Sequence, residues 1–299
     1  MFEVSDLTKV LLGPASIELG KRLAETLGAE SVPVESKSFP DSESYVRISG
    51  DVSGENVVIA QSTYPPQDRH LVQLLQLLDT ARDLEASKLV AVVPYLAYSR
   101  QDKRFRSGEA VTVKTVVKLV EAAGADSLVT VDVHSDKILE LFKIKALNVS
   151  AMSAIGEYFS SLRLREPYVF APDAGALDRA KIVAEQLDAE YAFFQKQRDR
   201  TTGAIKTEAK DVRVKDRDTI IVDDIISTGS TIANAASILR RQGARSIYVA
   251  CTHPLLLPGA KEKIIAAGAN EIIGTDCVAG DVSRVSVASI IAESLRKIL

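Results

Sequence analysis

Short apolar runs alternate with amphipathic segments along almost the whole chain. In the amphipathic segments the apolar residues recur every three or four positions, which is the spacing of one face of an α-helix. The apolar runs of the first half span residues 10–12, 32–39, 57–60, 88–94 and 128–133, and the helical segments span residues 17–27, 71–84 and 111–123. This alternation predicts an α/β fold with a doubly wound, mainly parallel sheet flanked by helices.

The second half repeats this order. Residues 24–30 (AETLGAE) match residues 184–190 (AEQLDAE), and residues 86–93 track residues 244–251, both at an offset of about 160 positions. We therefore expect two duplicated domains, with similarity due to the fold alone as the alternative. The predicted domains span residues 1–146 and 147–285, and the closing helix of residues 286–299 is a candidate to pack back on the first domain.

Composition limits the classes of protein that fit. The 299 residues are 46% hydrophobic and 26% charged, which is typical of a globular chain with room for two domains. The formal net charge of −3 gives no reason to expect nucleic acid or an anionic membrane as a partner, so any phosphate site must be local. Cys251 and Cys277 lack the spacing of metal ligands or of a disulfide framework. Neither a signal peptide nor a membrane span is apparent, and we expect a cytoplasmic protein.

The most informative stretch is residues 219–242. It predicts a buried strand over residues 220–222, a turn with the adjacent acids Asp223 and Asp224, a small loop, and a helix. The loop contains Ser227, Thr228, Gly229, Ser230 and Thr231. Because the loop has no bulky side chain, its backbone N–H groups can close around an anion. We expect Ser230 or Thr231 to cap the helix, whose positive end favours phosphate.

The two acids indicate what accompanies the phosphate. Carboxylates repel a phosphate, but they accept hydrogen bonds from vicinal hydroxyls or face a metal. A phosphate held beside a diol is a ribose 5-phosphate, which is the expected ligand. The alternative is an ordinary helix cap beside two solvated acids. In the first half the corresponding place is taken by residues 61–66, which contain neither acid nor glycine, so we expect only the second half to bind ribose phosphate.

Two other stretches carry features of a nucleotide site. Residues 39–43 (FPDSE) form a predicted turn, in which an exposed Phe39 stacks on a base and the carboxylates of Asp41 and Glu43 accept hydrogen bonds from an exocyclic amine. Residues 98–106 concentrate positive charge around Arg100 and Gln101, which suits a polyphosphate. The alternatives are an ordinary turn and a solvated basic loop.

Three further stretches place polar residues after strands. His134 follows the run at 128–133, and Asp173 follows the run at 169–171. Residues 196–203 (KQRDRTTG) form a charged loop that ends in glycine and that is suited to close on a phosphate chain. The alternatives are a surface histidine for His134 and a surface hairpin for residues 196–203.

Taken in order, these stretches resemble the ribose-phosphate diphosphokinases, also called phosphoribosyl pyrophosphate synthetases. The motifs are Phe-Pro-Asp-x-Glu, Ser-Arg-Gln-Asp, Asp-x-His, Pro-Asp-x-Gly, Lys-x-Arg and the Asp-Asp ribose-phosphate loop. The short chain and the Lys-Gln-Arg form are similar to archaeal members. Ser230 departs from the Gly or Ala of many members, which implies a tighter approach to the backbone there.

The resemblance implies two phosphoribosyltransferase-like domains and an enzyme of nucleotide biosynthesis. Such an enzyme transfers the pyrophosphoryl group of Mg-ATP to the C1 hydroxyl of ribose 5-phosphate, giving 5-phosphoribosyl 1-pyrophosphate and AMP. The alternatives are a type I phosphoribosyltransferase, which needs a single such domain and no ATP site, and a non-catalytic binding protein associated with the synthetase.

The resemblance also implies a role for each motif residue. Lys196 and Arg198 would be catalytic, on a mobile loop. ATP would be held by Phe39, Asp41, Ser42 and Glu43 of a neighbouring subunit together with Arg100 and Gln101, so that a homo-oligomer of at least two chains is expected. Ribose 5-phosphate would be bound by Arg198, Asp223, Asp224, Ser227, Thr228, Gly229, Ser230 and Thr231. Mg²⁺ would be held by His134 and Asp173.

Overall fold

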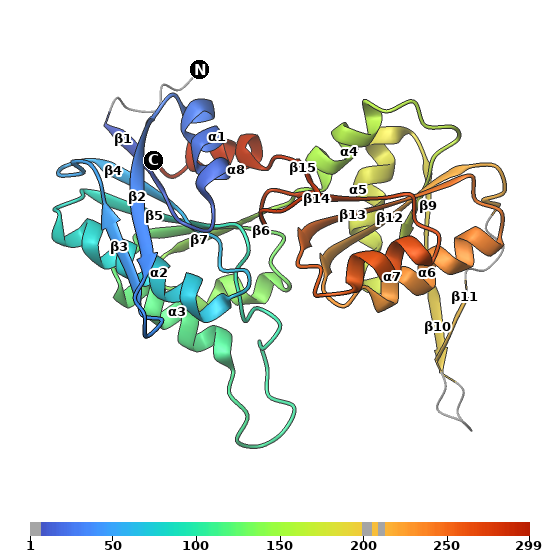
Figure 1. The fold of residues 1–299 in the computed structure, drawn as a ribbon, viewed down its shortest axis with the longest axis horizontal. Helices are drawn as coiled ribbons and strands as arrows, with labels where there is room; N and C mark the ends of the chain where they lie inside the picture. Colours follow the sequence, from blue (N-terminus) through green and yellow to red (C-terminus); the bar gives the residue numbers. More distant parts are fainter. Residues whose placement is uncertain (1–6, 199–204, 209–212) are drawn as a thin grey trace. The chain divides into compact units, whose positions relative to one another are not determined.

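The computed structural model describes residues 7–198, 205–208 and 213–299, with backbone only for residues 195–198 and 205–208. The chain forms two compact units. The first comprises Met1–Ser150, Asp276–Ala279 and Ser286–Leu299, and the second comprises Ala151–Thr275 and Gly280–Val285. Each unit is a mainly parallel sheet flanked by helices (Figure 1), which confirms the predicted fold class.

The first unit contains a seven-stranded sheet in the order β3-β2-β1-β4-β5-β6-β7, in which only the β2–β3 pair is antiparallel. Helices α1 and α8 cover one face and α2 and α3 cover the other (Figure 1). The strands are β1 (Thr8–Leu12), β2 (Glu30–Ser38), β3 (Ser44–Ile48), β4 (Asn56–Ala60), β5 (Lys88–Val93), β6 (Ser127–Val131) and β7 (Lys145–Val149). The helices are α1 (Ile17–Leu27), α2 (Gln67–Asp83), α3 (Thr112–Ala122), the 3₁₀ turn η1 (Asp136–Leu141) and α8 (Ala288–Leu295).

The second unit contains a six-stranded, wholly parallel sheet in the order β15-β14-β13-β12-β8-β9. Its strands are β8 (Tyr168–Ala171), β9 (Glu190–Phe193), β12 (Asp218–Ile226), β13 (Ser246–Pro254), β14 (Glu271–Thr275) and β15 (Ser283–Val285). Its helices are α4 (Met152–Ser160), η2 (Ala174–Ala176), α5 (Leu177–Leu187), α6 (Ser230–Arg241) and α7 (Ala260–Ala266). An antiparallel hairpin of β10 (Gln195–Arg198) and β11 (Ile205–Glu208) extends away from this sheet (Figure 1).

The central strands are apolar because both faces of each sheet are covered. β5 is buried at every position after Lys88, and the apolar side of α2 packs on it with Leu74, Leu77 and Leu78, which are fully buried. The two repeats predicted from the sequence end their helices alike. α1 stops at Gly28 and α5 stops at Asp188, both in the left-handed region with φ of 68° and 47°, and a strand starts two residues later in each case.

The C-terminal helix belongs to the first unit, where α8 packs against α1, β6 and β7. Its end is held by hydrogen bonds from the Arg296 side chain to the carbonyl of Thr26 (2.8 Å) and from the Lys88 side chain to the carbonyl of Ile298. Among the helices formed by the described residues, none is long and apolar enough to cross a membrane.

We expect replacement of Leu78 by Ala to lower the free energy of unfolding by about 2–5 kcal/mol, because it leaves a cavity where α2 meets the first sheet. Val72 lies on the same helix with 45% of its surface exposed. Val72→Ala is the matched control and should change stability by about 0.5 kcal/mol or less. Urea unfolding followed by circular dichroism measures both, and equal losses would contradict the assignment of the buried face.

Candidate active site

The second sheet reverses its strand order between β8 and β12. From β8 the chain adds β9 on one side, and it then returns to add β12, β13 and β14 on the other side. Ligands bind outside the carboxyl ends of parallel strands at such a point. Here the carboxyl end of β8 leads into Asp173, and the last part of β12 carries Asp223 and Asp224.

The two acids lie on the strand itself, because β12 extends through them to Ile226. The predicted acidic turn after residue 222 is therefore wrong. Asp223 Oδ1 accepts a hydrogen bond from the backbone N–H of Asp224 (2.9 Å), and Asp224 Oδ1 accepts one from the backbone N–H of Ile225 (3.0 Å). Main-chain donors thus hold both carboxylates at the end of the strand.

Arg179 of α5 bridges the point where the strand order reverses. Its guanidinium donates to Asp224 Oδ2 at 3.2 Å and to the carbonyl of Gly175 at 3.4 Å. Because α5 follows β8 and Asp224 lies on β12, this ion pair joins the two strands that flank the site. Asp224 is only 8% exposed, and removing one partner of a buried ion pair leaves the other charge uncompensated.

Burial, as the largest cause, and the negative charge of neighbouring Asp224 together raise the pKa of Asp223 to about 8, whereas Arg179 acts in the opposite direction. Near neutral pH the Asp223 carboxyl therefore keeps its proton. Cys251 lies opposite Asp223 on β13, and burial together with the two acids raises the pKa of its thiol well above the ordinary value. The acid pair can offer both a hydrogen-bond donor and acceptors to a hydroxyl-bearing ligand.

The loop after the acids leads directly into α6. Gly229 holds the N-cap position with φ of 72°, and the helix begins at Ser230, so the prediction that Ser230 or Thr231 caps the helix is wrong. Only glycine fits, because a Cβ at position 229 would lie 3.1 Å from the carbonyl oxygen of Ala260 and 3.0 Å from the Ile264 side chain. The N-cap residue is a glycine and forms no side-chain cap, so among the described residues the first backbone N–H groups of α6 remain available to an anion.

The hydroxyl groups of the loop face outward to different degrees. Thr228, Ser230 and Thr231 are exposed, Ser227 is half-buried, and Gly229 is buried beneath them. Small hydroxyl side chains around an uncapped helix start supply further hydrogen bonds to phosphate oxygens. The structure therefore brings together the acid pair and all five predicted loop residues at one end of β12.

The corresponding place in the first sheet is filled by protein. Gln61, Ser62 and Thr63 follow β4 and are fully buried. The Gln61 side chain accepts the backbone N–H of Ala15 at 3.0 Å, just before α1. A Cβ at Gly13 would lie 2.4 Å from both the carbonyl of Ala60 and Oε1 of Gln61. The N–H of Ala15 is thus committed to the Gln61 side chain, and the N–H of Ser62 is committed to Oγ of Ser16 at 2.9 Å.

The predicted nucleotide-binding turn is a tight hairpin between β2 and β3. Its backbone closes through Phe39 N–H to the carbonyl of Glu43 and Ser42 N–H to the carbonyl of Phe39 (both 2.9 Å), and Asp41 Oδ1 accepts the N–H of Glu43 (3.2 Å). Phe39 is 42% exposed, and the ammonium of Lys37 lies 5.6 Å from its ring centroid. The hairpin presents an aromatic face and carboxylates to the outside.

The basic loop lies between β5 and α3. Gln101 Oε1 accepts the hydroxyl of Thr112 at 2.5 Å, while Arg100 is exposed. Farther along, Glu109 Oε2 accepts the backbone N–H groups of Phe105 (2.9 Å) and Arg106 (3.0 Å). The loop is therefore ordered by its own hydrogen bonds and leaves its cationic side chains toward solvent.

The remaining predicted residues are spread over both units. His134 is exposed after β6 in the first unit, and Asp173 is half-buried after β8 in the second, where its Oδ1 accepts the N–H of Gly175 at 3.0 Å. Lys196 and Arg198 lie on β10, for which the structure describes the backbone. Residues 199–203 of the predicted loop lie outside the described residues.

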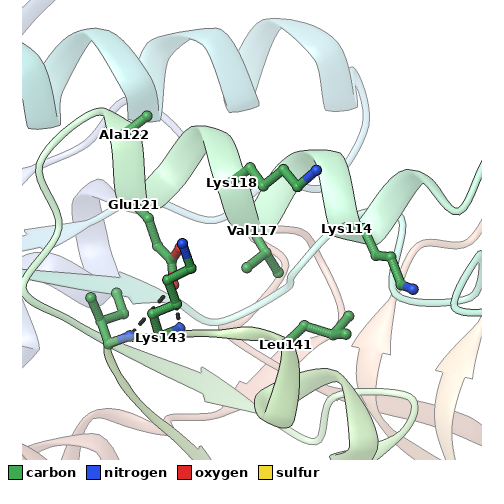
Figure 2. Close-up of a pocket in the computed structure, with 8 residues that line it drawn as sticks. Lys114, Val117, Lys118, Glu121, Ala122, Leu141 and Lys143 are labelled. Atoms are coloured by element: carbon green, nitrogen blue, oxygen red, sulfur yellow. Dashed lines mark hydrogen bonds between the residues drawn. The ribbon is translucent and has the colours of Figure 1, made fainter.

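Two hollows lie in the first unit. One, of about 590 Å³, borders the hairpin at Ser42 and Glu43 and is completed by α2 with Asp68 and Arg69. The other, of about 620 Å³, lies between α3 and the segment before β7 (Figure 2). It is lined by Lys114, Lys118 and Lys143, and its Glu121 carboxylate accepts the backbone N–H groups of Lys143 and Ile144. None of the predicted site residues lines this second hollow.

The fold and site define a protein of the phosphoribosyltransferase type: a parallel sheet with paired acids and a phosphate-sized loop at its carboxyl edge. The family model for the N-terminal domain of ribose phosphate pyrophosphokinase matches residues 8–124, and that for the phosphoribosyl transferase domain matches residues 137–269. The chain belongs to the ribose-phosphate pyrophosphokinase family, which confirms the predicted resemblance.

Individual relatives agree along the whole chain. Ribose-phosphate pyrophosphokinases of Sulfurisphaera tokodaii and Methanobrevibacter smithii are 40% and 43% identical, over 97% and 96% of this chain and 99% of each relative. The crystal structure of phosphoribosylpyrophosphate synthetase from Mycobacterium smegmatis superimposes with a TM-score of 0.84 at 28% identity, covering 98% of this chain and 99% of that one. The predicted enzyme class and reaction, pyrophosphoryl transfer from ATP to ribose 5-phosphate, are confirmed.

We expect Asp223→Asn to gain stability relative to the parent protein as the pH rises from 5 to 8. The native state keeps a proton on Asp223 up to about pH 8, whereas the unfolded chain releases it near the ordinary aspartate pKa of 3.8, so parental stability falls over this window. The free energy of unfolding of the parent should fall by up to about 1.4 kcal/mol per pH unit, and Asp223→Asn should remove this pH dependence because asparagine does not titrate.

Urea unfolding at a series of pH values measures this difference. Asp281→Asn is the control, because Asp281 is exposed and its contact with Lys261 lowers its pKa, so that it is ionised throughout this window in both states. A stability difference between Asp223→Asn and the parent that stays constant with pH would contradict the buried, protonated Asp223.

Proposed function

We propose that ribose 5-phosphate binds at the carboxyl end of β12, with its phosphate in the loop of residues 227–231 and its vicinal hydroxyls on Asp223 and Asp224. The observation that carries the proposal is the glycine-capped start of α6 next to the acid pair, of which Asp224 is buried and Asp223 is half-buried. The helix end attracts the dianionic phosphate, while Asp224 repels it. These opposite preferences orient the sugar, with C5 toward the helix and C1 toward the open end of the site.

ATP is proposed to bind through the hairpin and the basic loop. The exposed Phe39 ring can stack on adenine, and Asp41, Ser42 and Glu43 can accept or donate hydrogen bonds to the base and its ribose. Arg100 and Gln101 then contact the phosphates, with Gln101 oriented by its hydrogen bond from Thr112. An exposed guanidinium is suited to two-point recognition of phosphate oxygens.

Magnesium is proposed to be held by Asp173 and His134 together with the ATP phosphates. Asp173 offers a hard carboxylate at a strand end, with Oδ1 oriented by the N–H of Gly175. Mg²⁺ usually keeps several waters and takes few protein ligands, so the phosphates of ATP and water would complete its coordination. Bound there, Mg²⁺ would neutralise charge on the phosphoryl group in transfer.

In the proposed reaction the C1 hydroxyl of ribose 5-phosphate attacks the β-phosphorus of ATP. The new bond joins the C1 oxygen to the β-phosphorus, and the C1 hydroxyl gives up its proton to solvent. The bond from the β-phosphorus to the oxygen that bridges it to the α-phosphorus breaks, and AMP leaves with that oxygen. Lys196 and Arg198 are proposed to stabilise the charge that moves onto the bridging and leaving oxygens. Such transfer depends on position and charge stabilisation more than on covalent catalysis.

We expect Lys196→Ala to lower the rate of AMP formation from ATP and ribose 5-phosphate by about 10²–10³, because one donor to the developing charge is lost. The assay follows AMP in the presence of Mg²⁺ and both substrates, with a reaction lacking ribose 5-phosphate as the blank. Lys215→Ala is the control, since Lys215 lies outside the predicted site. Parental AMP formation by Lys196→Ala would overturn the role given to this residue.

We further propose a cytoplasmic homo-oligomer in which the hairpin of one subunit completes the ATP site of another. Cys251 and Cys277 are both buried and unbridged, which suits a reducing compartment. The exposure of the Phe39 hairpin supports a contact outside its own subunit.

Shared sites predict complementation between two inactive variants. A hairpin variant, Asp41→Ala/Glu43→Ala, is co-expressed with Lys196→Ala under a second affinity tag, and mixed oligomers are purified over both tags. Some of their sites combine an intact hairpin with an intact loop, so AMP formation should return. The control pair, Lys196→Ala with Arg198→Ala, should stay inactive because both defects lie on the same loop. Failure of the first pair to recover activity would exclude the shared site.

A further inference from the structure

Helix α7 forms an outer wall of the ribose-phosphate loop. The carbonyl of Ala260 and the side chain of Ile264 press against Gly229, at 3.1 and 3.0 Å from the place of a Cβ there. Just before the helix, the backbone N–H of Leu257 donates to the carbonyl of Ser227 at 3.1 Å. The loop is therefore shaped from outside by a segment about 30 residues farther along the chain.

Lys263 of α7 forms hydrogen bonds with the loop of residues 227–231. The Lys263 ammonium donates to the carbonyl of Thr228 at 3.0 Å and to Oγ of Ser230 at 3.2 Å. An ammonium has three N–H donors and no acceptor. After these two hydrogen bonds, one N–H and the full positive charge of Lys263 remain beside the loop of residues 227–231. Within the part of the chain that the structure describes, no carboxylate forms an ion pair with Lys263.

These contacts act on the loop in two ways. A hydrogen bond from an ammonium holds the Thr228 carbonyl, whose partial negative charge would otherwise be free to turn toward an incoming phosphate. Because Oγ of Ser230 accepts from Lys263, its hydroxyl hydrogen is left to be donated elsewhere, and a phosphate oxygen is the suitable acceptor. Lys263 therefore arranges the loop for an anion and adds a positive charge beside it.

We propose that Lys263 is a positioning residue for the phosphate end of ribose 5-phosphate, which it recognises through Thr228 and Ser230. The inference rests on the proposed binding of ribose 5-phosphate in this loop. In this role Lys263, which lies on α7, helps the site to select a phosphorylated pentose over an unphosphorylated one.

The chain supplies a matched control on the same helix. Lys261 lies two residues before Lys263, and its ammonium pairs with Asp281 instead of the loop. Lys261→Gln removes the same charge from α7 without removing a contact to the loop. Lys263→Arg keeps the charge and donors with a different geometry, so it should recover part of what Lys263→Gln loses.

The first measurement is calorimetric titration of the full-length protein with ribose 5-phosphate and, separately, with ribose. For Lys263→Gln we expect the dissociation constant for ribose 5-phosphate to rise about 10- to 100-fold, as for a lost charge-assisted hydrogen bond. Lys261→Gln should bind like the parent protein. Affinity for ribose should not change in any variant, because ribose has no phosphate for the loop to hold.

The second measurement is steady-state kinetics. Lys263→Gln should raise the KM for ribose 5-phosphate while the KM for ATP stays the same, a split that loss of folding would not give. Added salt should weaken ribose 5-phosphate binding more steeply in the parent than in Lys263→Gln. Thermal melting checks that the variants remain folded. If Lys263→Gln has a lower melting temperature than the parent, Lys263→Arg is the variant used to test the role of Lys263.

The possible results test the role of Lys263 separately from the proposed binding of ribose 5-phosphate. If the parent protein does not bind ribose 5-phosphate, the proposed function fails and the role of Lys263 fails with it. If the parent binds and Asp224→Asn weakens binding, but Lys263→Gln and Lys263→Arg both bind like the parent, only the role of Lys263 is overturned. Equal losses in Lys261→Gln and Lys263→Gln would also overturn it, because the effect would then be general charge.

Discussion

The site depends on two carboxyl groups kept at the buried end of one strand. Asp223 and Asp224 are neighbours on β12, and desolvation together with mutual repulsion would ordinarily expel such a pair. Three features retain it: backbone N–H donors, the single guanidinium of Arg179, and the proton on Asp223. Because Asp224 repels anions, the proposed binding mode places the phosphate on the side of α6 and the sugar hydroxyls on the acids.

The two sheets share one topology but differ at the place where the proposed binding site lies. In the second unit the residues after β12 are small and end in a glycine that leaves α6 uncapped. In the first unit Gln61 fills the equivalent space and accepts the N–H of Ala15, while Ser62 and Thr63 bond to the backbone of neighbouring loops. Protein side chains therefore occupy the place that corresponds to the proposed phosphate site, and their hydrogen bonds connect the loops of the first unit.

The apolar runs were sufficient to predict the central parallel strands, because buried strands must be apolar on both faces, but not the edge strands β7 and β15 or the helix α4. They were insufficient where tertiary contacts determine whether a segment is a strand or where an element ends. β3 is mostly half-buried and exposed, so its pattern is weak, and β12 continues past the apolar residues because Arg179 and main-chain donors support its acids. Gly229, not Ser230, caps α6 because α7 leaves no room for a Cβ. Arg179 and Lys263 have no local signal, since they meet the site only through contacts 45 and 33–35 residues away in sequence.

The return of α8 to the first unit sets a condition on biogenesis. Residues 288–295 pack on α1 and the strands β6 and β7, yet they are synthesised only after the second unit. While the ribosome is still translating the second unit, the part of the first sheet around β6 and β7 lacks this apolar cover, and it can be closed only after residues 288–295 have left the exit tunnel. Completion of the first unit therefore waits for synthesis of the second, and the nascent chain needs protection from aggregation until then.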